Sequence, residues 1–81
     1  GAIAAWKRAA DLKPDDFLVR DQLAGLYTRR KSYDDAIAVY RQTTRIRATS
    51  PVPWNALGLV QQKKGDYEGA ITSFQTAIKR D

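Results

Sequence analysis

The chain of 81 residues contains neither cysteine nor histidine. The absence of cysteine excludes disulfides and thiolate chemistry, and the absence of histidine removes the most common general base and a frequent metal ligand. No apolar run approaches the ~20 residues that a membrane-spanning helix needs, so the sequence predicts no membrane span. The few glycines form no phosphate-binding loop. The sequence therefore predicts no catalytic residues, no cofactor and no metal site, and the chain is not expected to be an enzyme.

The chain does contain an internal repeat. Ala2, Ala36 and Ala70 lie at equal intervals of 34 residues. A fixed period in the range of ~20 to 50 residues marks units that bury their apolar faces only by stacking on copies of themselves. Each alanine precedes an isoleucine and, three residues further on, an aromatic residue: Ile3 and Trp6, Ile37 and Tyr40, Ile71 and Phe74.

The register of the repeat divides the chain into units. We expect residues 1–16 to form the second helix of a partial unit, 17–50 a full unit and 51–81 a nearly complete unit, together one repeat-domain fragment. Within each unit, apolar residues recur at steps of three and four, which is typical of an amphipathic helix. The sequence predicts an all-α chain whose helices lie near residues 1–12, 17–30, 33–46, 52–64 and 67–80.

Capping residues support these boundaries. Ser50 precedes a segment whose first turn tolerates Pro51 and Pro53, because backbone N–H groups there have no acceptor within the helix. Ser32 and Asp66 stand where the second helices of two units begin, and such side chains accept hydrogen bonds from the first turn.

The pattern of large and small residues resembles the tetratricopeptide repeat family along the whole chain. The residues that carry the resemblance in the last unit are Trp54, Leu57, Gly58, Ala70 and Phe74, and those in the preceding unit are Leu23, Ala24, Tyr27, Ala36 and Tyr40. The resemblance implies a right-handed α-α superhelix, a solenoid of antiparallel helical hairpins, that acts as a protein-interaction scaffold.

Some residues depart from the family pattern. Arg20 replaces the large aromatic that Trp54 supplies, and Gln61 replaces a tyrosine. Five aromatic side chains lie at packing positions of the repeat, so we expect them to fill the core rather than to stack on a ligand. This set consists of Trp6, Tyr33, Tyr40, Tyr67 and Phe74.

The first helices of successive units are expected to line a concave groove, because each unit is rotated slightly against the last. By the family resemblance, this groove binds a peptide segment or a partner protein. The candidate residues combine apolar patches with a basic rim, and ordinary solvated helix surface is the alternative interpretation. They are Leu18, Asp21, Gly25, Thr28, Arg29, Val52, Asn55, Leu59, Gln62 and Lys63.

A net charge of +5 raises a rival hypothesis. Arg29, Arg30 and Lys31 recur as Lys63 and Lys64, so basic residues meet the same edge of two units and could contact phosphates or an acidic partner. Cations in the last turn of a helix are also what the helix dipole favours. We therefore give capping electrostatics precedence and do not expect nucleic-acid binding.

Self-association is the remaining alternative. The repeat register places Gly1 within a unit and no capping helix after Asp81, so apolar side chains at both ends are expected to be partly bare. Bare ends favour a homo-oligomer through the terminal helices. The residues concerned are Ile3, Trp6, Ile71, Phe74 and Ile78. No feature of the sequence identifies the partner or the compartment, for which intracellular is only the default.

Overall fold

The computed structural model describes residues 1–80 and shows five helices in that range. They are α1 (Ala2–Leu12), α2 (Phe17–Arg29), α3 (Tyr33–Ile46), α4 (Val52–Lys64) and α5 (Tyr67–Arg80). All five lie within a residue of the ranges expected from the apolar periodicity, so the helix prediction is confirmed. Asp81, the last residue assigned to the third unit, lies outside the described residues.

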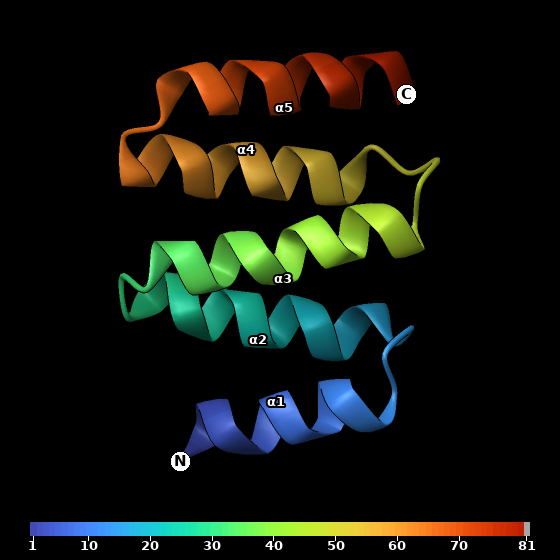
Figure 1. Ribbon diagram of the computed structural model, residues 1–81, viewed down its shortest axis with the longest axis vertical. Coiled ribbons are helices and arrows are strands. Elements are labelled where there is room, and N and C mark those ends of the chain that lie inside the picture. The colour runs from blue at the N-terminus through green and yellow to red at the C-terminus, as the bar shows by residue number, and fades with distance from the viewer. Residues whose placement is uncertain (81) are drawn as a thin grey trace.

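The helices form a stack in which each one packs against the next in the sequence. Figure 1 shows α1 at one end of the stack and α5 at the other, with consecutive helices antiparallel. The α2–α3 and α4–α5 turns lie along one edge, and the longer connections lie along the opposite edge (Figure 1). The predicted all-α repeat superhelix is confirmed. Among residues 1–80 no helix has both the length and the apolar character required to cross a membrane.

Short polar side chains fix the helix starts. The Asp16 Oδ1 atom accepts hydrogen bonds from the backbone N–H groups of Leu18 and Val19, at 3.1 and 3.3 Å. Asp66 Oδ1 accepts from the Gly69 N–H at 3.0 Å, and Ser50 Oγ accepts from the Val52 N–H at 3.2 Å. These bonds satisfy donors that have no partner within the helix.

The side-chain cap expected at Ser32 was wrong. Ser32 occupies the N-cap position of α3, but its hydroxyl makes no capping hydrogen bond. Its backbone angles, φ −87° and ψ 66°, differ from the extended conformation in which a capping side chain reaches the first turn.

Two clusters of buried apolar side chains form the core. The first centres on Leu23 and Ala24, and the second on Ile37 and Leu57. Tyr27 and Tyr40 are half-buried and pack against both clusters, so they join the two parts of the core. Tyr33 and Trp54 pack only against the second cluster.

Small residues allow the helices to approach closely. Ala24 and Ala36 are completely buried, and Gly58 is buried at the position of α4 that corresponds to Ala24. A Cβ atom on Gly58 would lie 2.7 Å from Cε1 of Phe74, which is closer than a carbon atom tolerates. The absence of a side chain at Gly58 therefore lets the Phe74 ring reach the backbone of α4.

The prediction that all five aromatics fill the core was wrong for Tyr67 and Trp6, which are 64% and 36% exposed. Tyr33, one repeat before Tyr67, is covered because it packs against the cluster that contains Leu57 of the next hairpin. No helix in residues 1–80 follows α5 to cover Tyr67 in the same way. The exposure of Trp6 agrees instead with the expectation of bare terminal faces.

The two turns at the shared edge close in different ways. Gly65 ends α4 with φ 97°, a left-handed conformation that glycine adopts without steric cost. Lys31 occupies the corresponding place after α2 with φ 61°, and among residues 1–80 it is the non-glycine residue with positive φ. A Cβ atom makes this conformation unfavourable, so the α2–α3 turn stores strain that the α4–α5 turn avoids.

The close approach at Gly58 predicts opposite effects for two glycine-to-alanine substitutions. Gly58→Ala should lower the free energy of unfolding by about 1 to 2 kcal/mol, because the clash with Phe74 outweighs the gain in helix propensity. Gly25→Ala should raise it by about 0.5 to 1 kcal/mol, because no atom lies within 4 Å of the added Cβ. Urea denaturation followed by circular dichroism measures both. A stability loss of equal size in the two variants would contradict the packing described for Gly58.

The strained turn predicts that Lys31→Gly stabilises the protein by about 0.5 to 1 kcal/mol, because glycine removes the cost of the left-handed conformation. Gly65→Ala, the reciprocal change in the next turn, should destabilise it. Differential scanning calorimetry should show Tm moving up for the first variant and down for the second. An unchanged or lower Tm for Lys31→Gly would show that the Lys31 turn carries no strain.

Candidate functional site

The ten groove candidates form five pairs that are 34 residues apart, one member on α2 and the other on α4. Eight of the ten side chains are exposed, and Gly25 and Thr28 are half-buried. We call this set the first-helix face. Its pairs are Leu18 with Val52, Asp21 with Asn55, Gly25 with Leu59, Thr28 with Gln62, and Arg29 with Lys63.

Three large apolar side chains on the first-helix face are exposed to solvent. Leu18 is 74% exposed, Val52 is 55% exposed and Leu59 is 53% exposed. Leu18 and Val52 stand near the starts of their helices, whereas Leu59 lies in the middle of α4. Gly25, the repeat equivalent of Leu59, leaves the middle of α2 open, with no atom within 4 Å of its missing Cβ position. The face therefore offers apolar contacts at equivalent positions of α2 and α4, at Leu18 and Val52. At Gly25 it also exposes the backbone of α2, because no side chain covers it.

Two polar side chains of this face, Thr28 and Asp21, interact with other residues of the protein. The Thr28 hydroxyl donates to the carbonyl oxygen of Ala24 at 2.8 Å, so its hydrogen is used within α2. Asp21 lies close enough to Tyr40 to affect its ionisation. Burial raises the pKa of the Tyr40 hydroxyl above its usual value, and the negative charge of Asp21 raises that pKa further. Tyr40 is consequently a neutral phenol at physiological pH, packed behind the face rather than displayed on it.

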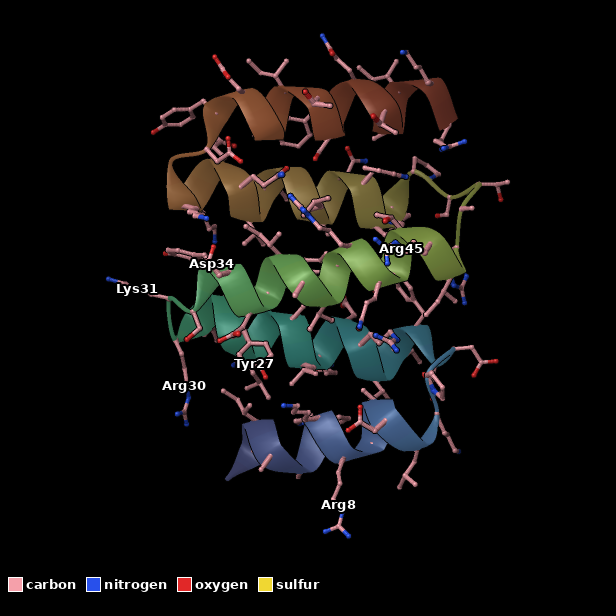
Figure 2. The ribbon with its side chains drawn as sticks, in the orientation of Figure 1. Arg8, Tyr27, Arg30, Lys31, Asp34 and Arg45 are labelled. Atoms are coloured by element: carbon pink, nitrogen blue, oxygen red, sulfur yellow. The ribbon has the colours of Figure 1, made fainter. Side chains whose placement is uncertain are left out.

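Basic residues gather at the edge formed by the α2–α3 and α4–α5 turns. Arg29 lies in the last turn of α2, and Lys63 and Lys64 lie in the last turn of α4, where cations favour the helix dipole. Figure 2 shows Arg30 and Lys31 projecting from the turn away from the stack. We call these residues the basic edge.

One cation of the basic edge is already paired. The Lys64 ammonium contacts Asp34 Oδ1 at 2.5 Å across the α3–α4 boundary. The Lys64 and Asp34 side chains are 45% and 81% exposed, so the ion pair adds little to stability.

The terminal faces match the sequence prediction in part. Ile71 is 56% exposed and Ile78 is 75% exposed on α5, and Trp6 is exposed on α1. Phe74 is half-buried against Gly58, and Ile3 is half-buried because it packs against the first core cluster. The bare surface of α5 is therefore centred on the two isoleucines.

A cleft that the sequence analysis did not anticipate lies between α3 and α5, with α4 as its floor. Its volume is about 610 Å³. The residues that matter for its chemistry are Arg41 and Arg45 on α3, Trp54 and Leu57 on α4, and Gly69 and Thr72 on α5. A comparison of repeat-equivalent residues could have indicated this cleft. Gly69 stands where the preceding unit has the larger Asp35, so the later unit has more open space at this position.

The departures from the family pattern are built into the core as hydrogen-bonded polar groups. Arg20 is buried, its Nε donates to the Pro14 carbonyl oxygen, and its Nη1 donates to Gln42 Oε1 at 2.7 Å. Gln61 is also buried, and its Oε1 accepts from the Ser73 hydroxyl at 2.5 Å. These bonds compensate for the burial of polar groups at positions where the family places aromatic rings.

Comparisons with known proteins agree with the geometry. A family model described as "TPR repeat" matches residues 24–65, and one described as "Tetratricopeptide repeat" matches residues 51–81. No curated protein matches the chain.

Solved structures share the fold. A structure titled "MamA MSR-1 C2" superimposes with a TM-score of 0.90 and 22% sequence identity, covering 99% of this chain and 46% of that one. A second, titled "Crystal structure of MamA", has a TM-score of 0.85 and 26% identity, covering 98% of this chain and 46% of that one. The chain thus spans less than half the length of each of these structures.

Proposed function

Because the chain belongs to the tetratricopeptide repeat family, a family of protein-interaction modules, we propose that it is a non-enzymatic scaffold whose first-helix face binds a peptide segment. The observation that carries this proposal is the exposure of large apolar side chains on the first-helix face, namely Leu18 and Val52, which lie one repeat apart, and Leu59. In a stack of helical hairpins, the first helices of successive units share one side, which is the concave side of the solenoid.

The chemistry of the face suggests the kind of segment that binds. Apolar side chains of the peptide would cover Leu18, Val52 and Leu59. An acidic group of the peptide would contact Arg29 and Lys63 of the basic edge. Gly25 gives the peptide access to the backbone of α2, since no side chain stands between them. An exposed apolar surface of this kind gains free energy when a partner removes it from water.

The test uses peptides selected from a random 12-residue display library for binding to the chain. We expect heteronuclear NMR shift changes on titration to concentrate in α2 and α4, at the residues of the first-helix face. Leu59→Asp should weaken binding at least tenfold, because a charged side chain replaces the central apolar contact.

A matched variant separates this effect from a change in charge. Gln75→Glu adds the same negative charge at an exposed position of α5, and its affinity should remain that of the wild-type chain. The proposal is wrong if both variants bind equally or if the shift changes lie outside α2 and α4.

Self-association is a second candidate function, and the exposure of Ile71 and Ile78 favours it. A second copy of the chain would cover these side chains, with α5 either meeting another α5 across a two-fold axis or meeting α1 of the next copy. Trp6 and Leu12, both exposed on α1, are large apolar side chains available for the second arrangement.

Sedimentation equilibrium across a hundredfold range of concentration tests this candidate. We expect the mean mass to rise with concentration and the Ile78→Glu variant to remain a monomer, because the charge opposes burial of the face. Thr72→Glu places the same charge at an exposed position in the α3–α5 cleft and should still associate. A wild-type chain that stays monomeric throughout would refute self-association.

Nucleic-acid binding receives less support from the structure. Lys64 is engaged with Asp34, and the last-turn cations complement the helix dipoles. The half-buried Tyr27 and Tyr40 pack against the core clusters, so these rings are not free to stack on bases.

A further inference from the structure

The α3–α5 cleft lies on the side of α4 opposite to the first-helix face. Residues of an α-helix are separated by about 100° around its axis, so Trp54 and Leu57 point almost directly away from Asn55 and Leu59. The cleft and the first-helix face therefore share α4 but face different directions. A ligand in one leaves the other free.

An equivalent cleft exists one repeat earlier, between α1 and α3 with α2 as its floor. Its volume is about 240 Å³, compared with about 610 Å³ for the α3–α5 cleft. Lys7, Asp11 and Leu23 line it at positions 34 residues before Arg41, Arg45 and Leu57. The fold thus produces the same cleft twice, and the side chains decide how much of it stays open.

The earlier cleft is filled from within. Arg20 lies where Trp54 lies in the later cleft, and its guanidinium extends to Gln42 on the facing wall. Asp35 takes the place of Gly69 on the second wall. The earlier cleft also carries balanced charge, because Lys7 and Arg20 are matched by Asp11 and Asp35.

The later cleft has unbalanced charge. Arg41 and Arg45 are exposed and stand one helical turn apart on α3, and neither side chain makes a hydrogen bond or ion pair with any residue in the range 1–80. Figure 2 shows Arg45 extending from α3 toward α4. The carboxylate in this cleft, Asp66, already accepts from the backbone N–H of Gly69 as the cap of α5.

Beneath the arginines, Trp54 and Leu57 form an apolar part of the floor beside the buried amide of Gln61. Leu57 is 3% exposed, and Trp54 is half-buried beside it. The Trp54 indole N–H is buried and has no acceptor in the described part of the chain. Gly69 has no side chain to extend from α5 into the cleft, so Trp54 and Leu57 remain accessible between α3 and α5.

We propose that the α3–α5 cleft binds an acidic peptide segment of a partner protein. Carboxylates of the segment pair with the guanidinium groups of Arg41 and Arg45, which hold carboxylates through paired N–H donors. A neighbouring apolar side chain of the segment covers Trp54 and Leu57. The charge complementarity of the two free arginines selects an acidic segment, and a volume of about 610 Å³ suits part of a peptide better than a single small anion.

The experiment uses Trp54 as a reporter. In a Trp6→Phe background Trp54 is the remaining tryptophan, so its fluorescence reports on the floor of the cleft. The probe is an acetylated and amidated 12-residue peptide of equal numbers of glutamate and leucine, and the matched peptide carries glutamine in place of glutamate. We expect a saturable change in Trp54 fluorescence with the acidic peptide, weakened by added salt, and at least tenfold weaker binding of the glutamine peptide.

Three double variants locate the binding. Arg41→Gln with Arg45→Gln should weaken the acidic peptide at least tenfold, whereas Arg8→Gln with Lys79→Gln removes the same charge from exposed positions outside both surfaces and should leave its affinity unchanged. Arg29→Gln with Lys63→Gln reports on binding at the first-helix face. Thr72→Glu should also abolish binding, because the new carboxylate on the facing wall pairs with the arginines. All of these side chains are exposed, and circular dichroism melts check that the fold is retained.

Several results would overturn the proposal. They are equal binding of the acidic and glutamine peptides, unchanged affinity after loss of Arg41 and Arg45, and no fluorescence change at all. Loss of binding only in the Arg29 and Lys63 variant would place the acidic peptide on the first-helix face, which would support the proposed function and refute this one. Displacement of the peptide by N-acetylglutamate at equal concentration would also refute it, because a small anion would then suffice.

Discussion

The contact between Phe74 and the backbone of Gly58 sets the spacing on which the last hairpin depends. A Cβ atom on Gly58 would lie 2.7 Å from the ring, so the two helices hold this separation only while position 58 carries no side chain. The preceding hairpin has the small Ala24, which is completely buried, at the corresponding position. Protein interiors are packed as densely as organic crystals. A small residue at the position of Ala24 and Gly58 therefore determines how closely the two helices of a hairpin approach and how their larger side chains pack.

The same spacing gives α4 two separate surfaces. Its buried residues hold the helix between α3 and α5, while Asn55 and Leu59 stand on one side and Trp54 and Leu57 on the other. The side of Trp54 and Leu57 carries a cleft, because the walls supplied by α3 and α5 leave space above α4.

Much of the fold could be predicted from the sequence, because the 34-residue register and the apolar periodicity are both local signals. The exposure of Tyr67 could not, since its repeat equivalent Tyr33 packs against a cluster that includes Leu57 and Val60 of the next hairpin. The α3–α5 cleft was missed for a similar reason. Arg20 fills the α1–α3 cleft, whereas Gly69 leaves the α3–α5 cleft open, and such a difference in volume becomes apparent only when three helices are placed together. The binding role of the first-helix face remains a prediction.

Tyr27 and Tyr40 belong to the surroundings of both core clusters, and this shared packing has a consequence for how the stack comes apart. In a linear array, the free energy of unfolding is the sum of the stabilities of the units and of the interfaces between them. If one part of the core opened alone, both tyrosine rings would lose their contacts with that cluster and keep those with the other cluster. The interface therefore contributes to the stability of both parts of the core, and the described helices should melt in a single cooperative transition, like one domain rather than a string of independent ones.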